Sequence, residues 1–83
     1  MNAALTHTQL VSITELFNGL HELGRLRVHE RDALLEAVAT IRQADEAVPR
    51  LAEACRILQL RGSLREGITR AVDDIVSPAG TAR

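Results

Sequence analysis

Apolar residues recur every three or four positions along almost the whole chain, which is the spacing of amphipathic α-helices. The first helix is predicted from about Thr8 to Leu23. Two residue pairs have the capping-box spacing that can start it, Thr6 with Gln9 and Ser12 with Glu15. The apolar positions of this stretch are Leu10, Val11, Ile13, Leu16, Phe17, Leu20 and Leu23.

A short reversal separates this stretch from a second one with the same spacing. Gly24 is a typical residue to end a helix, and only residues 25–27 follow before the next helix, predicted from about His29 to Gln43. A connection this short predicts an antiparallel helical hairpin. The apolar stripe of the second helix is Leu34, Ala37, Val38 and Ile41, flanked by Ala33 and Leu35.

Pro49 marks a second interruption, because proline lacks the backbone N–H and disfavours helical geometry at the residue before it. Either one long helix kinks here, or the second helix ends and a third begins; we prefer the break. The third helix is predicted from about Pro49 to Leu60, with Gly62 as its stop. Its inward positions are Leu51, Ala54, Cys55 and Leu58.

A fourth helix is predicted to begin at Ser63, which has capping-box spacing with Glu66, and to end at Ser77 and Pro78. Its buried face is Leu64, Ile68, Ala71, Val72, Ile75 and Val76. The chain is therefore predicted to be a single all-α domain, residues 1–83. It is a small bundle of about four short amphipathic helices, with flexible termini at residues 1–7 and 78–83.

The small size of the chain bears on how it is stabilised. A domain of 83 residues gains little net stability from its core alone, and the single cysteine, Cys55, allows no intrachain disulfide. The three histidines lack metal-ligand spacing, so neither a metal nor a cofactor is expected. The apolar stripe of the first helix is wider than one neighbouring helix can cover, so we expect a homodimer. Its predicted interface is Leu10, Ile13, Leu16, Phe17 and Leu20.

Catalytic chemistry finds little support in the sequence. Cys55 falls on an apolar stripe, where a lone cysteine is typically a small core residue. The carboxylates form no general acid–base pair, and no glycine-rich phosphate loop is present. No catalytic residue is predicted, and we do not expect an enzyme. No apolar run reaches the ~20 residues that span a bilayer, and no secretory signal is recognised, so a cytoplasmic protein without a membrane partner is expected.

Basic residues gather around the first reversal. They are His21, Arg25, Arg27, His29 and Arg31. One interpretation is a surface for an anionic segment of a partner, or for phosphate. The other is a set of solvated charges that pair locally with Glu22, Glu30 and Asp32, which is the common outcome for exposed ions.

The stretch from Glu53 to Arg65, EACRILQLRGSLR, resembles the DNA-binding unit of Fis-type regulators. The resemblance implies a helix-turn-helix over residues 50–76, preceded by two dimerising helices. The residues that would contact phosphate or bases are Arg61, Ser63, Arg65 and Arg70. The stretch departs from the family at Gln59, which occupies the usual turn-glycine position, and at Asp73 and Asp74, where a basic helix is expected.

Two functions follow from these features. The first is a protein–protein interaction module or small regulator of the adaptor, co-chaperone or anti-activator type. It would act as a homodimer on a protein partner through an apolar helical surface. The alternative is a DNA-binding transcriptional regulator with a degenerate Fis-like helix-turn-helix. Asp73 and Asp74 repel a phosphate backbone, which favours the first function.

Overall fold

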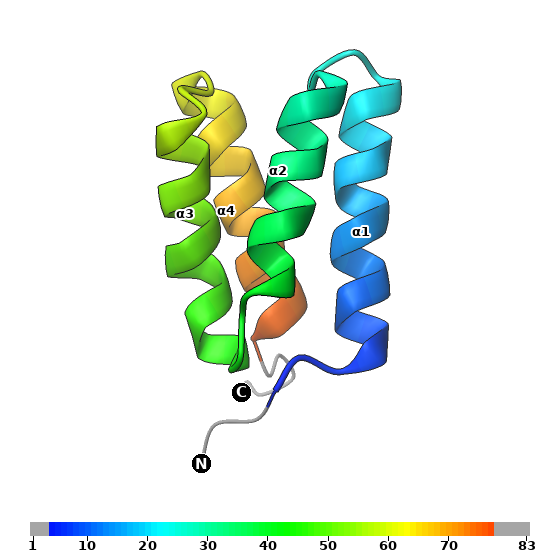
Figure 1. Cartoon of the computed structure of the whole chain (residues 1–83), viewed down its shortest axis with the longest axis vertical. Helices are drawn as coiled ribbons and strands as arrows, with labels where there is room; N and C mark the ends of the chain where they lie inside the picture. Colours follow the sequence, from blue (N-terminus) through cyan, green and yellow to red (C-terminus); the bar gives the residue numbers. More distant parts are fainter. Residues whose placement is uncertain (1–3, 78–83) are drawn as a thin grey trace.

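Four α-helices make up most of the chain in the computed structural model, which describes residues 4–77. They are α1 (His7–Glu22), α2 (Val28–Ala39), α3 (Ala47–Ile57) and α4 (Gly62–Val76), and a short 3-10 helix, η1 (Ala44–Glu46), precedes α3. The helices run alternately up and down (Figure 1), and each packs against the next, with α4 returning to α1. The described residues contain no strand. The all-α class and the hairpin of the first two helices are confirmed.

The core lies between the four helices because each helix turns its apolar stripe inward. Every helix contributes residues spaced by four, and Phe17, the only aromatic side chain, is fully enclosed. Burying one such large apolar side chain stabilises the fold by ~1.5–3 kcal/mol. The buried residues are Ile13, Phe17, Leu26, Leu34, Val38, Ala47, Leu51, Cys55, Leu64, Ile68 and Val72.

The capping box of α1 forms at Thr6, not at Ser12. The Thr6 Oγ1 atom accepts a hydrogen bond from the Gln9 backbone N–H at 3.1 Å, and the Gln9 Oε1 atom accepts one from the Thr6 N–H at 2.8 Å. Leu5 packs against the core before the helix begins. Thr6 and Leu5, inside the segment 1–7 predicted to be flexible, are therefore held in place; residues 1–3 and 78–83 of the predicted flexible termini lie outside the described residues.

Helix α2 ends four residues earlier than the periodicity predicts. Thr40 is its C-cap, and the Thr40 hydroxyl donates to the carbonyl of Ala37 at 2.7 Å. The chain then leaves the helix, yet Ile41 still packs against the core. Its apolar position therefore fits the helical repeat although the backbone is not helical. The Arg42 N–H donates to the Glu46 Oε1 atom at 3.0 Å, which secures this connection.

The predicted break between the second and third helices is confirmed, although its position shifts. The third helix begins at Ala47 and not at Pro49, and it follows directly on η1. Pro49 occupies the third helical position, where the missing N–H would have no partner inside the helix. Ala47 and Leu51 are fully buried, so this first turn is held to the core by packing.

The turn between α3 and α4 corrects two predictions, the stop at Gly62 and the cap at Ser63. Helix α3 ends at Ile57, and the turn is closed by hydrogen bonds from Gln59 N–H to Arg56 carbonyl and from Leu60 N–H to Cys55 carbonyl. Gly62 is instead the first residue of α4. Arg61 is its N-cap with an extended backbone, and its side chain makes no capping bond.

Candidate functional site

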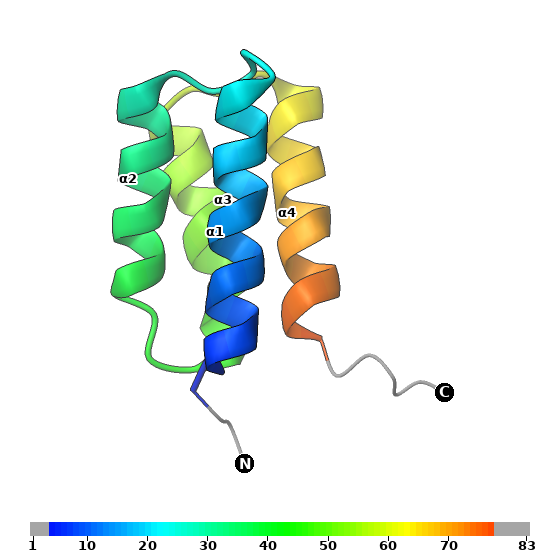
Figure 2. The same ribbon diagram turned by 90° about the vertical axis from the view of Figure 1, so that its right-hand side faces the viewer.

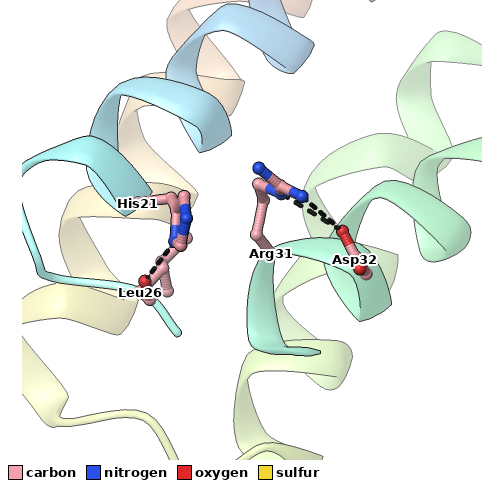
Figure 3. Close-up of polar contacts among 4 residues, drawn as sticks. All are labelled: His21, Leu26, Arg31 and Asp32. Carbon is pink, nitrogen blue, oxygen red and sulfur yellow. Dashed lines mark hydrogen bonds and ion pairs between the residues drawn. The ribbon is translucent and has the colours of Figure 1, made fainter. Parts of the chain in front are cut away.

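The α1–α2 loop is fixed at both of its ends. After α1, Gly24 has a left-handed backbone (φ 77°), and hydrogen bonds from Gly24 N–H to His21 carbonyl and from Arg25 N–H to Leu20 carbonyl form a Schellman turn. Leu26 then turns into the core, only 2% exposed. Its carbonyl oxygen lies 2.9 Å from the Nδ1 atom of His21, which ties the loop back to α1 (Figure 3).

A side-chain hydrogen bond satisfies one backbone N–H group at the start of helix α2. The Glu30 Oε1 atom accepts a hydrogen bond from the Arg27 N–H at 2.9 Å. One residue on, the Arg31 guanidinium pairs with Asp32 at 3.0 Å (Figure 3). Among the described residues, neither carboxylate forms an ion pair with Arg25 or Arg27.

The α3–α4 loop approaches the α1–α2 loop because the alternating helices place both loops at the same end of the bundle (Figures 1 and 2). We call this the loop end, residues 21–31 and 56–65. It carries six arginines against two glutamates, and Arg31 and Arg56 also pair with Asp32 and Glu53 just outside it, which leaves a net charge of +2, whereas the whole chain carries −1. The bundle is therefore electrically asymmetric along its length.

A cavity of about 430 Å³ opens between the two loops; we call it the loop-end cavity. Three guanidinium-bearing residues line it, together with the apolar Leu60 and Leu64. Within residues 4–77, no ion pair involves these three arginines. The full lining is Gly24, Arg25, Arg27, Glu30, Gln59, Leu60, Arg61, Ser63 and Leu64.

The structure divides the four predicted anion-contacting residues between two places. Arg61 and Ser63 line the loop-end cavity, but Arg65 and Arg70 lie in a separate groove of about 620 Å³ between α3 and α4. That groove also holds two carboxylates and a third arginine, so its charge is mixed. Its lining is Pro49, Ala52, Glu53, Arg56, Arg65, Glu66, Thr69 and Arg70.

The basic cluster at the first reversal is also divided. Arg25 and Arg27 face the loop-end cavity, whereas His21 contacts the loop carbonyl and Arg31 pairs with Asp32. His29 is exposed. Two of the five residues therefore join Arg61 across the loops. That combination could not be seen in the sequence, where Arg27 and Arg61 stand far apart.

The predicted dimer interface lies partly inside the bundle. Ile13 and Phe17 are fully buried among the other helices, so in this conformation they have no surface for a second subunit. Leu16 and Leu20 are half-buried and pack against the core. Only Leu10, 36% exposed, presents a substantial surface. The wide stripe of α1 is therefore covered chiefly by α2 and α4.

Three large apolar side chains at the loop end are exposed, one of which, Leu23, the sequence assigned to the apolar stripe of the first helix. They are Leu23 at 75%, Val28 at 51% and Ile57 at 66%. Each stands at a helix end: Leu23 is the C-cap of α1, Val28 the first residue of α2 and Ile57 the last residue of α3. The apolar periodicity does not predict that these residues are exposed, because it assigns a residue to the inner or outer face only within a helix and not at its end.

The cysteine and the possible metal ligands were the other candidate functional groups. Cys55 is enclosed in the core, and burial raises the pKa of its thiol, which disfavours the nucleophilic thiolate. Among the described residues, no group of three or more His, Cys, Asp or Glu side chains could hold a metal ion. No helix in that part of the chain has the length and apolarity to cross a membrane.

The chain matches no protein-family model, no curated protein and no solved structure. The resemblance to Fis-type regulators therefore rests on the segment 53–65 alone. In the fold, Gln59 at the turn position adopts the left-handed backbone (φ 58°) for which glycine is favoured. The helices on either side of this turn lie antiparallel (Figures 1 and 2), whereas those of a helix-turn-helix cross at about 90–120°.

Proposed function

We propose that the chain is a small protein–protein interaction module that binds its partner through the loop end of the bundle. The observation that carries this proposal is the combination of exposed apolar residues and unpaired arginines on that one end. Several exposed apolar side chains gathered on one end and rimmed by polar residues are typical of interaction sites. Arginine is favoured in interfaces because its guanidinium group binds carboxylates in a bidentate manner. The apolar residues are Leu23, Val28 and Ile57.

Self-association belongs to the same proposal. A domain of this size, with one buried cysteine, gains stability from a second subunit. Because Ile13 and Phe17 are enclosed, the large apolar residues that α1 still exposes are Leu10 and Val11, at 36% and 40%. A dimer formed there leaves the loop end free for a partner. Sedimentation at micromolar concentrations tests it, and a single monomeric species that persists on concentration would contradict it.

The DNA-binding alternative has weaker support. The exposed positions of α4 include three acidic residues against one arginine: Glu66, Asp73 and Asp74 against Arg70. These carboxylates would repel a phosphate backbone. We expect negligible binding to a random DNA duplex near physiological salt. Binding that weakens steeply with salt, and that is lost in Arg65→Glu, would favour the alternative.

Site-specific photo-crosslinking tests the interaction module directly. A photoreactive amino acid at Ile57 samples the loop end, and the same amino acid at Val11 samples the proposed dimer surface on α1, away from the loop end. In cells that express the protein, we expect a discrete protein adduct from position 57, and expect that adduct to be absent from position 11. The proposal would be wrong if position 57 gave no adduct, or if both positions gave the same adducts.

A further inference from the structure

Within residues 4–77, the three arginines of the loop-end cavity form no ion pair. Arg25 and Arg27 come from one loop and Arg61 from the other. Glu30, the only carboxylate of the lining, accepts the hydrogen bond of the Arg27 backbone N–H and forms no ion pair with the three guanidinium groups. Positive charge converging on a hollow from two loops favours an anionic group inside it.

The same cavity is only partly polar. Leu60 is half-buried and Leu64 is 8% exposed, and both contribute to the lining. A volume of about 430 Å³ falls within the usual range for pockets that bind small ligands, ~300–1,000 Å³. A lining of arginines and leucines fits a ligand that carries both negatively charged groups and an apolar side chain.

We propose that the loop-end cavity binds a short acidic segment of a protein partner, in which an apolar side chain stands between carboxylates. This inference rests on the proposed function and adds the chemistry of the partner. The apolar side chain of the segment packs against Leu60 and Leu64, and its carboxylates pair with Arg25, Arg27 and Arg61. Leu23, Val28 and Ile57 extend the contact to apolar side chains further along the segment.

Two other anionic partners fit this geometry less well. A membrane surface is flat and would leave a hollow between two loops unfilled, even though exposed apolar residues accompany the arginines. A nucleic-acid backbone carries regularly spaced phosphates with no apolar side chain for Leu60 and Leu64. It would also approach the loop end without making use of Ile57, which is 66% exposed.

Nuclear magnetic resonance titration with defined peptides tests the inference. The probe is acetyl-Gly-Asp-Leu-Glu-Leu-Asp-Gly-amide, and its control replaces the acidic residues with Asn and Gln. We expect the acidic peptide to cause saturable shift changes at residues 24–30 and 59–64, and the neutral peptide to bind at least about tenfold more weakly. Loss of several charge pairs of up to ~1 kcal/mol each produces a change of that size.

Matched variants assign the effect to the cavity. Arg61→Gln should weaken binding of the acidic peptide about three- to fivefold, the effect of one lost charge pair. Arg42→Gln is the control, because Arg42 is exposed and lies between α2 and η1, away from the loop end. Val28→Ser should weaken binding, whereas Ala39→Ser, at the exposed last residue of the same helix and away from the loop end, should not. Helical circular dichroism verifies that each variant remains folded.

Each opposing result contradicts a different statement. Equal binding of the neutral and acidic peptides at the loop end would overturn the acidic specificity and leave the interaction module intact. A phosphoserine version that binds more than about tenfold tighter than the glutamate version would identify phosphate, and not carboxylate, as the ligand. Binding to phosphatidylserine vesicles that the acidic peptide does not displace would favour a membrane. Absence of peptide binding together with absence of a crosslink from position 57 would overturn both proposals.

Discussion

The Nδ1 atom of His21 lies 2.9 Å from the carbonyl oxygen of Leu26, so the last turn of α1 holds the loop that follows it. Leu26 is the one buried residue of that loop, and both of its neighbours, Arg25 and Arg27, line the loop-end cavity. The contact between His21 and Leu26 therefore positions two of the three cavity arginines.

Removing this contact should loosen the loop. His21→Ala is expected to lower the free energy of unfolding by ~0.5–1.5 kcal/mol, the net contribution of one hydrogen bond. Urea unfolding measures the change. His29→Ala is the matched control because the His29 side chain is exposed and forms no hydrogen bond within residues 4–77; it should leave the stability within ~0.5 kcal/mol. Equal effects of the two variants would contradict the structural role of His21.

The two left-handed turn positions predict opposite effects. Gly24 and Gln59 have φ of 77° and 58°, and each closes the same type of turn at a helix end. Gly24→Ala should destabilise the protein by ~1–2 kcal/mol, because a side chain disfavours this backbone conformation. Gln59→Gly removes that cost and should stabilise the protein by up to ~1 kcal/mol, despite the greater entropy of glycine in the unfolded chain.

Thermal unfolding measures both changes. A shift of 1 kcal/mol corresponds to ~4–8 °C in Tm for a domain of this size. A lower Tm for Gln59→Gly would show that the Gln59 side chain contributes contacts that outweigh its backbone strain.

Part of the loss of stability in acid should trace to Glu46. The pKa of this carboxyl is lowered, first by the hydrogen bond from the Arg42 N–H and also by the charge of Arg50. A lowered pKa in the folded state means that ionised Glu46 stabilises the fold at neutral pH. This contribution begins to fade as the pH falls below the unfolded value of about 4.5 and is lost below the folded pKa.

Unfolding measured between neutral and acidic pH tests this dependence. Glu46→Gln should show a shallower loss of stability below pH ~4.5 than the unmodified protein. Asp45→Asn removes the same charge one residue earlier, at an exposed side chain without that hydrogen bond. The Asp45→Asn variant should keep the part of the stability loss below pH ~4.5 that comes from Glu46. An unchanged slope in Glu46→Gln would contradict the assignment.

Cys55 should react with a thiol reagent only when α3 opens. The side chain is fully buried and burial raises the pKa of the thiol, so both access and the thiolate fraction are low in the folded state. We expect labelling by a disulfide reagent near pH 8 to be slow, and to accelerate with urea. The double variant Cys55→Ala with Ile57→Cys places the only thiol at an exposed position and should react immediately. Rapid labelling of folded, unmodified protein would contradict the buried position.

Local sequence signals predicted the elements that depend on neighbouring residues. Thr6 and Gln9 form their capping box, and Gly24 ends α1, because caps and turns are decided over a few residues. Ile41 misled the prediction of the second helix end, since it packs on the core without belonging to the helix. Ser63 misled the start of the fourth, because after the turn at Gln59 the cap of α4 is Arg61, two residues earlier.

The candidate site could not be predicted in the same way, because it depends on tertiary structure. Arg25 and Arg61 line one cavity only because α1 and α3 both end at the same end of the bundle. The sequence likewise gives the width of the α1 stripe but not what covers it. Phe17 was therefore predicted at a subunit interface and is found at the centre of a single bundle.

The alternation of the four helices also determines how the protein can be presented on a solid support. Helix α1 begins and α4 ends at the end of the bundle opposite the two loops (Figures 1 and 2). A linker attached beyond either helix would orient the arginine-lined hollow away from the support and towards the solution. Immobilised protein should thus retain access for a soluble partner, whichever end of the chain carries the linker.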